Sequence, residues 1–225
     1  MAFTSYDAAT HAIGRSRDLL AGARPRVARG RDGVKLFRSG GGLSPETRGD
    51  MRRLSVVMAV AALDTYMHRL IVERVYKHDT LPNGLARLDV GFEDLLRQTD
   101  ATATAARAQP HKPKPRVGVK RQLRDRLLRE TFQNYDAVAR ALSMAGYPKA
   151  WPKIGKKMQA PREPTEIKQR LNGIVVRRHQ IVHEGDYERL ERPRKPRRNP
   201  LSAQQARKDI DFIAELIDAI HAVVS

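Results

Sequence analysis

The chain of 225 residues contains no cysteine. This absence excludes disulfide bonds, zinc sites built on cysteine thiolates and a catalytic cysteine nucleophile. It is also typical of a protein of the reducing cytoplasm, which is the location we expect.

Long apolar runs are missing as well. The longest run, residues 56–63, is far shorter than the roughly 20 residues that a membrane-spanning helix needs. The first residues, with Ser5 and Asp7 among them, lack the basic and then apolar pattern of a secretory signal. We therefore expect no association with a membrane.

Acidic residues are outnumbered. The 25 Asp and Glu against 43 Lys and Arg give a formal net charge of +18. A basic excess of this size predicts binding to a polyanion, because each phosphate contact releases condensed counterions. The alternatives are a protein kept soluble by its charge or one that binds an acidic protein.

Helical periodicity dominates the chain, and we find no strand alternation, internal repeat or second domain. The expected fold is all-α, a bundle of four to five main helices with long basic loops in one domain of residues 1–225. Helices are expected over residues 6–20, 45–77, 92–98, 119–145, 165–184 and 203–224. Residues 56–63 are apolar on every side, so the second helix should be the buried centre, with the last helix packed on it.

The helix ends carry recognisable signals. Ser5 and Ser44 are expected N-caps, and Ser202 with Gln205 forms an expected capping box. Gly146 and Gly185 are expected to end the helices that precede them. Between helices, residues 22–42 (within the N-terminal unit 1–43), 147–164 and 186–200 are predicted basic loops, and residues 99–118 a flexible insertion.

The helix over residues 165–184 contains an anomaly. One apolar stripe along it comprises Ile167, Leu171, Ile174, Val175, Ile181 and Val182. Arg178 falls in the middle of this stripe, where a guanidinium is costly unless it is paired or faces a special cavity. The structural alternative is an ion pair with a buried carboxylate such as Asp64, or a side chain that extends out of the core.

His179 and His183 are one helical turn apart and share a face. The spacing suits a zinc pair, but a metalloprotease helix has Glu directly after its first His, and Gln180 stands here. No third ligand is evident, so we expect no metal and no other cofactor. The alternative for each His is a surface residue without a role.

The string from Arg178 to His183 (RHQIVH) resembles the R-x4-H signature of HEPN domains, with His179 as the polar residue that follows the Arg. In that family the signature lies near the end of a late helix, after an apolar stretch like residues 171–175. Residues 60–66 resemble the family's long second helix. Residues 132–135, 146–147 and 151–154 are similar to the RNase LS-like toxin (RiboL-PSP-HEPN) branch. The resemblance covers residues 44–224.

The resemblance implies a helical bundle that often forms a homodimer, in which two R-x4-H motifs face one cleft. Many members cleave RNA without metal as toxins of toxin–antitoxin systems or as antiviral effectors, which would add an antitoxin or defence protein as partner. The chemistry suits these residues. His183 can exchange a proton near neutral pH, Arg178 can bind the phosphate, and His179 would assist.

One difficulty is the angle between the two proposed catalytic side chains around the helix. Arg178 and His183 are five residues apart, or about 140° around a straight helix. They converge on one phosphate only if the Arg side chain reaches round the helix, the helix end is distorted, or a second subunit supplies one of them.

Further cations and one aromatic residue are expected to bind the RNA backbone, with Trp151 stacking on a base. They are Arg177, Arg189, Arg192, Arg194, Lys195, Arg197, Arg198 and Trp151. The alternative is a solvated charged segment.

Two other functions compete with a ribonuclease. One is a non-catalytic HEPN module that binds RNA or nucleotide, although such modules usually lack the Arg or the His. The other is a DNA-associated protein in which Arg178 is structural, but we find no recognition helix of a helix-turn-helix.

Overall fold

The computed structural model describes residues 4–22, 28–29, 35–36, 43–74, 123–189 and 197–225. The main elements are the helices α1 (Ser5–Gly22), α2 (Pro45–Arg74), α6 (Tyr135–Met144), α7 (Trp151–Lys157), α8 (Pro164–Glu184) and α9 (Ala203–Val224). Residues 123–127 form one further short helical stretch. The predicted all-α class is therefore confirmed.

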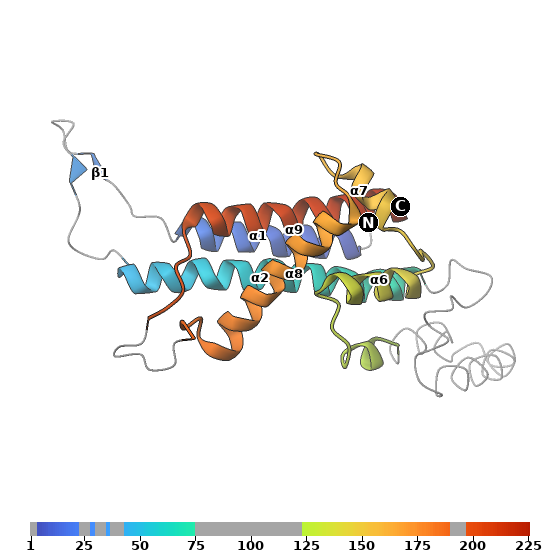
Figure 1. The fold of residues 1–225 in the computed structure, drawn as a ribbon, viewed down its shortest axis with the longest axis horizontal. Helices are drawn as coiled ribbons and strands as arrows, with labels where there is room; N and C mark the ends of the chain where they lie inside the picture. The colour runs from blue at the N-terminus through green and yellow to red at the C-terminus, as the bar shows by residue number, and fades with distance from the viewer. Residues whose placement is uncertain (1–3, 23–27, 30–34, 37–42, 75–122, 190–196) are drawn as a thin grey trace, which may run out of the picture.

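Three long helices, α1, α2 and α9, pack against one another, and α8 and α6 pack on α2 (Figure 1). Figure 1 shows α8 running obliquely to α2, so that its Gly185 end lies clear of α1 and α9. The contact between α2 and α9 confirms the predicted packing of the last helix on the central one.

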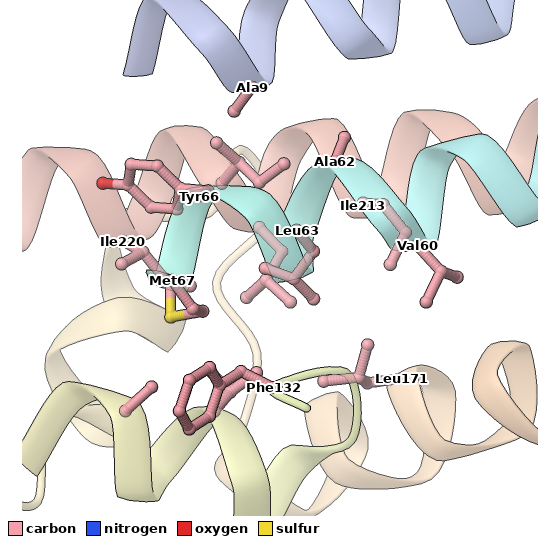
Figure 2. Close-up of a cluster of buried hydrophobic side chains, with 14 of the residues drawn as sticks. Ala9, Val60, Ala62, Leu63, Tyr66, Met67, Phe132, Leu171, Ile213 and Ile220 are labelled. Atoms are coloured by element: carbon pink, nitrogen blue, oxygen red, sulfur yellow. The ribbon is translucent and has the colours of Figure 1, made fainter. Parts of the chain in front are cut away.

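The core surrounds α2. Leu63, Tyr66 and Met67 of this helix are fully buried. Figure 2 shows Ala9 of α1 on one side of α2, with Phe132 and Leu171 on the other. By length and composition alone α2 could also cross a membrane, but 61% of its apolar window is buried against the other segments. Its apolar residues are thus accounted for by the core of the bundle.

Two helix starts differ in their caps. Ser44 caps α2 as predicted, because its Oγ accepts the Thr47 N–H at 3.1 Å. The predicted cap at Ser5 is wrong: Thr4 and Asp7 cap α1 reciprocally, at 3.1 and 2.9 Å. Ser5 instead donates through its N–H and its Oγ to Glu73, at 2.6 and 2.7 Å, which joins the start of α1 to the end of α2.

The start of α9 confirms half of its predicted capping box. Ser202 Oγ accepts the Gln205 N–H at 3.0 Å. The Gln205 side chain does not return to the Ser202 backbone but donates to Asp209 Oδ1 at 2.9 Å.

The predicted helix over residues 119–145 is interrupted. Asp64 of α2 accepts the Phe132 N–H at 2.6 Å and the Gln133 side chain at 3.1 Å. Asn134 then starts α6 by accepting the Ala137 N–H at 2.8 Å. The prediction of one continuous helix is therefore wrong. The Asp64 carboxylate, which is distant in sequence, binds the backbone between two shorter helices. Gly146, with φ 91°, follows the end of α6 as expected.

Two predicted loops contain regular structure. The segment 147–164 holds α7, because the apolar residues Trp151 and Ile154 turn into the core. The segment 22–42 holds the strands β1 (Ala28–Arg29) and β2 (Lys35–Leu36), which pair antiparallel. The expected helix 92–98 and the insertion 99–118 lie outside the described residues.

Replacing Leu63 with Ala should lower the free energy of unfolding by about 2–5 kcal/mol, because it opens a cavity in the centre of the core. Leu54, in the same helix, is 49% exposed, so Leu54→Ala should cost less than about 1 kcal/mol. Urea denaturation of both variants measures the difference. Equal losses would contradict the central position of α2.

Candidate functional site

The candidate residues lie on the C-terminal third of α8. The helix starts with a capping box between Glu163 and Glu166 and ends at Gly185, whose φ of 62° favours glycine. Its first half buries Ile167, Leu171, Ile174 and Val175 in the core. Beyond these residues burial declines, and Val182 is 47% exposed. The apolar stripe therefore extends past the core of the single chain.

Arg178 is half-buried, and none of the described residues pairs with its guanidinium. Asp64, the carboxylate considered as its partner, binds the backbone of Phe132 and the Gln133 side chain, and lies 3.6 Å from His68 Nε2. The ion pair considered between Arg178 and Asp64 is therefore not formed. Arg178 keeps its charge and its hydrogen-bond donors available for an anion.

His179 and His183 are both exposed on α8. Their ring centroids are 5.9 Å apart and the rings are nearly perpendicular. The helix is regular through Glu184, so Arg178 and His183 keep their angular separation of about 140°. Distortion of the helix end is thus excluded as the way to bring them together. Either a long side chain or a second subunit must do so.

His179 and His183 were also considered as metal ligands. Within the described ranges no group of three or more His, Asp or Glu residues could hold an ion. The pair of His179 and His183 lacks a third ligand from this part of the chain.

The neighbouring Arg177 has a different environment from Arg178. Its Nη2 donates to Asp186 Oδ2 at 2.9 Å and to the carbonyls of Asn199 and Pro200 at 3.1 and 3.2 Å. Asp186 is fully buried. To bind RNA, as predicted, Arg177 would have to leave these acceptors and deprive the buried carboxylate of a compensating charge.

Sequence reasoning missed three residues beside the site. Asp186 also accepts Arg53 Nε of α2 at 2.6 Å, and the Asn199 side chain donates to its Oδ1 at 3.3 Å. The available signal was an acidic residue directly after the glycine that ends a helix. Nothing in the sequence identifies Arg53 or Asn199 as its partners, since they are 133 and 13 residues away.

The structure describes some of the predicted cations that follow α8. Arg189 is exposed and pairs with Glu184, and its hydrogen bonds lower the pKa of the Glu184 carboxyl. Arg197 is exposed, and Arg198 pairs with Asp50. Arg192, Arg194 and Lys195 lie outside the described residues.

Trp151 does not face solvent. It is only 6% exposed, at the start of α7, and its ring stacks on Tyr135 with centroids 4.2 Å apart. The prediction that Trp151 lies in a basic loop and stacks on a base is therefore wrong, because the core already covers its ring.

An open groove of about 1110 Å³ lies elsewhere, between α1, the N-terminal half of α8 and α9. Several of its cations are already paired, as Arg17 is with Asp211 and Arg162 with Glu215. The groove does not include Arg178, His179 or His183. His179 and His183 thus lie on an exposed part of α8, with the half-buried Arg178 on the same helix.

Comparisons of the chain with models of protein families, with curated proteins and with solved structures find no match in any of the three.

Neutralising the cations after α8 should weaken RNA binding and flatten its salt dependence. With Arg189, Arg192, Arg194, Lys195 and Arg197 changed to Gln, the slope of log Kd against log salt should fall by about 0.7 for each phosphate that the protein no longer neutralises. Arg198 is kept because it pairs with Asp50 of the distant helix α2, whereas the pair of Arg189 with Glu184 is local and exposed. Arg15→Gln with Arg207→Gln, on α1 and α9, is the control. An unchanged slope would mean that the cluster is only a solvated segment.

Proposed function

We propose that this protein is a metal-independent endoribonuclease of the HEPN type, acting as a toxin or antiviral effector. The observation that carries the proposal is the contrast between two adjacent arginines. Arg177 pairs with the buried Asp186, whereas Arg178 has no partner among the described residues and lies on the same helix as two exposed histidines. A guanidinium without a partner, on a helix that also carries two exposed imidazoles, suits cleavage of a phosphodiester.

In the proposed reaction the RNA 2′-OH attacks the adjacent phosphorus, and the bond to the 5′-oxygen breaks. The 2′-OH loses a proton and the leaving oxygen gains one, so the products are a 2′,3′-cyclic phosphate and a 5′-hydroxyl. His183 serves as the acid or base, and Arg178 binds the non-bridging oxygens through two hydrogen bonds. His179, whose ring meets that of His183 edge-on, assists or orients it.

A homodimer resolves the angular separation. The exposed Val182 and the half-buried Ile181 extend the apolar stripe beyond the core of one chain, where a second copy could cover them. With the two α8 helices at one cleft, Arg178 of one subunit and His183 of the other can approach the same phosphate. Dimerisation is then part of the mechanism.

The wild-type protein should cleave RNA in EDTA and leave DNA intact, because DNA lacks the 2′-OH. His183→Ala should reduce the rate by roughly 10²–10⁴-fold through the lost proton transfer. Arg178→Ala should cost a comparable factor through lost charge stabilisation, and His179→Ala less. Cleavage of total RNA, with analysis of the product ends, measures these effects.

Two outcomes would contradict this proposal. RNA binding without cleavage would favour the alternative, a non-catalytic HEPN module that binds RNA or nucleotide. Full cleavage by His183→Ala, together with unfolding of Arg178→Ala, would make Arg178 a structural residue.

Mixing the two inactive variants tests the composite site. In a dimer of one Arg178→Ala chain and one His183→Ala chain, one of the two sites keeps both side chains. Random exchange of subunits should therefore restore about a quarter of the wild-type activity. The double variant mixed with His183→Ala is the control and should stay inactive. If the mixture of single variants also stays inactive although the subunits exchange, each site belongs to one chain.

A further inference from the structure

The C-terminal turn of α8 is tied to two other elements by one carboxylate. Asp186 lies three residues after His183 and is fully buried. It accepts Arg53 of α2 at 2.6 Å and Arg177 of α8 at 2.9 Å, and Asn199, before α9, donates to it at 3.3 Å. The side chains of Arg53 and Arg177 are only 11% and 23% exposed. The ion pairs are therefore shielded from water far more than a surface salt bridge is.

The backbone of the same turn is fixed from both sides. Gly185 and Asp186 both have positive φ, at 62° and 60°. The Asp186 N–H donates back to the Gln180 carbonyl at 2.9 Å, and its own carbonyl accepts the Asn199 N–H at 2.8 Å. Aspartate tolerates this left-handed conformation better than most residues with a side chain, and the two backbone hydrogen bonds hold it there.

The turn needs such an anchor because apolar packing does not supply one. Val182, His183 and Glu184 are all exposed, and helix ends without tertiary contacts fray. Catalytic side chains have to be held within a fraction of an ångström by the groups around them.

From this geometry we infer that Asp186 is a positioning residue for the candidate site, and that the adjacent arginines divide two tasks. Arg177 compensates Asp186 and joins it to α8, which leaves Arg178 free for a phosphate group. Through Arg53 and Asn199 the carboxylate sets the position of the helix end relative to α2 and α9. The part of this inference that concerns catalysis rests on the proposed ribonuclease function.

The test replaces Asp186 with Asn, which keeps the shape of the side chain and removes its charge. Asp136→Asn is the matched control, since Asp136 is exposed on α6 and pairs only with Lys168 among the described residues. Losing the charge leaves Arg177 without a carboxylate and Arg53 with only the more distant Asp50, at 3.9 Å, so Tm should fall by roughly 5–10 °C. If Asp186→Asn does not fold, Asn199→Ala takes its place. It removes the amide that donates to Asp186 Oδ1 and to the Asp186 and Tyr187 carbonyls, and it keeps the charge of Asp186.

Below its Tm, Asp186→Asn should show kcat lowered by roughly 10–100-fold with KM little changed, because the groups that bind substrate remain but are no longer aligned. Amide exchange of residues 181–186 should be faster, and the NMR signals of the His183 imidazole should shift without RNA present. Arg177→Ala should lower Tm, whereas Arg178→Ala should abolish cleavage at an unchanged Tm.

The two proposals can fail separately. If the wild-type protein does not cleave RNA, the proposed function is wrong, and amide exchange with the His183 signals still decides whether Asp186 positions the turn. If a folded Asp186→Asn keeps wild-type kcat, exchange and His183 signals, Asp186 only stabilises the fold and the inference is overturned. An Arg178→Ala variant with the lowered Tm expected of Arg177→Ala would overturn the division of tasks.

Discussion

The burial of α2 is the constraint on which the arrangement of the described helices depends. The middle of this helix is apolar on nearly every side, and Val56, Val60, Leu63 and Met67 are fully buried. No single neighbouring helix can cover so much of the apolar surface of α2. The helices α1 and α9 therefore pack along α2, and α6 and α8 also pack on it. Hydrophobic burial is not directional, however. It requires that α2 be covered without fixing where the ends of the covering helices lie.

Polar groups of α2 fix where the ends of the covering helices lie. Asp64 captures the backbone before α6, and Arg53, three turns earlier, holds the end of α8 through Asp186. Both contacts join segments that are far apart in the sequence, and both lie at the edge of the core, where one carboxylate can meet several donors. A buried charge without these partners would be costly, so the alternatives to this arrangement are disfavoured.

The candidate site follows from the same division between apolar and polar contacts. The core holds the first half of α8, and the Asp186 cluster holds its end. Between them lie the half-buried Arg178 and the exposed His179 and His183. A helix fixed at both ends can present charged side chains to solvent in a defined geometry.

The sequence by itself determined the all-α class, the start of α2, the bounds of α8 and the central place of α2, because these follow from local periodicity and from caps such as Ser44 and Gly185. It also singled out Arg178 as an anomaly in an apolar stripe. Only the tertiary structure decided that Asp64 interrupts the predicted helix before α6 and that Trp151 lies in the core. It also decided that Arg177 rather than Arg178 pairs with a buried carboxylate. The physical reason is that a hydrogen bond or ion pair between distant residues leaves no periodic trace in the chain, whereas the burial of one helix face does.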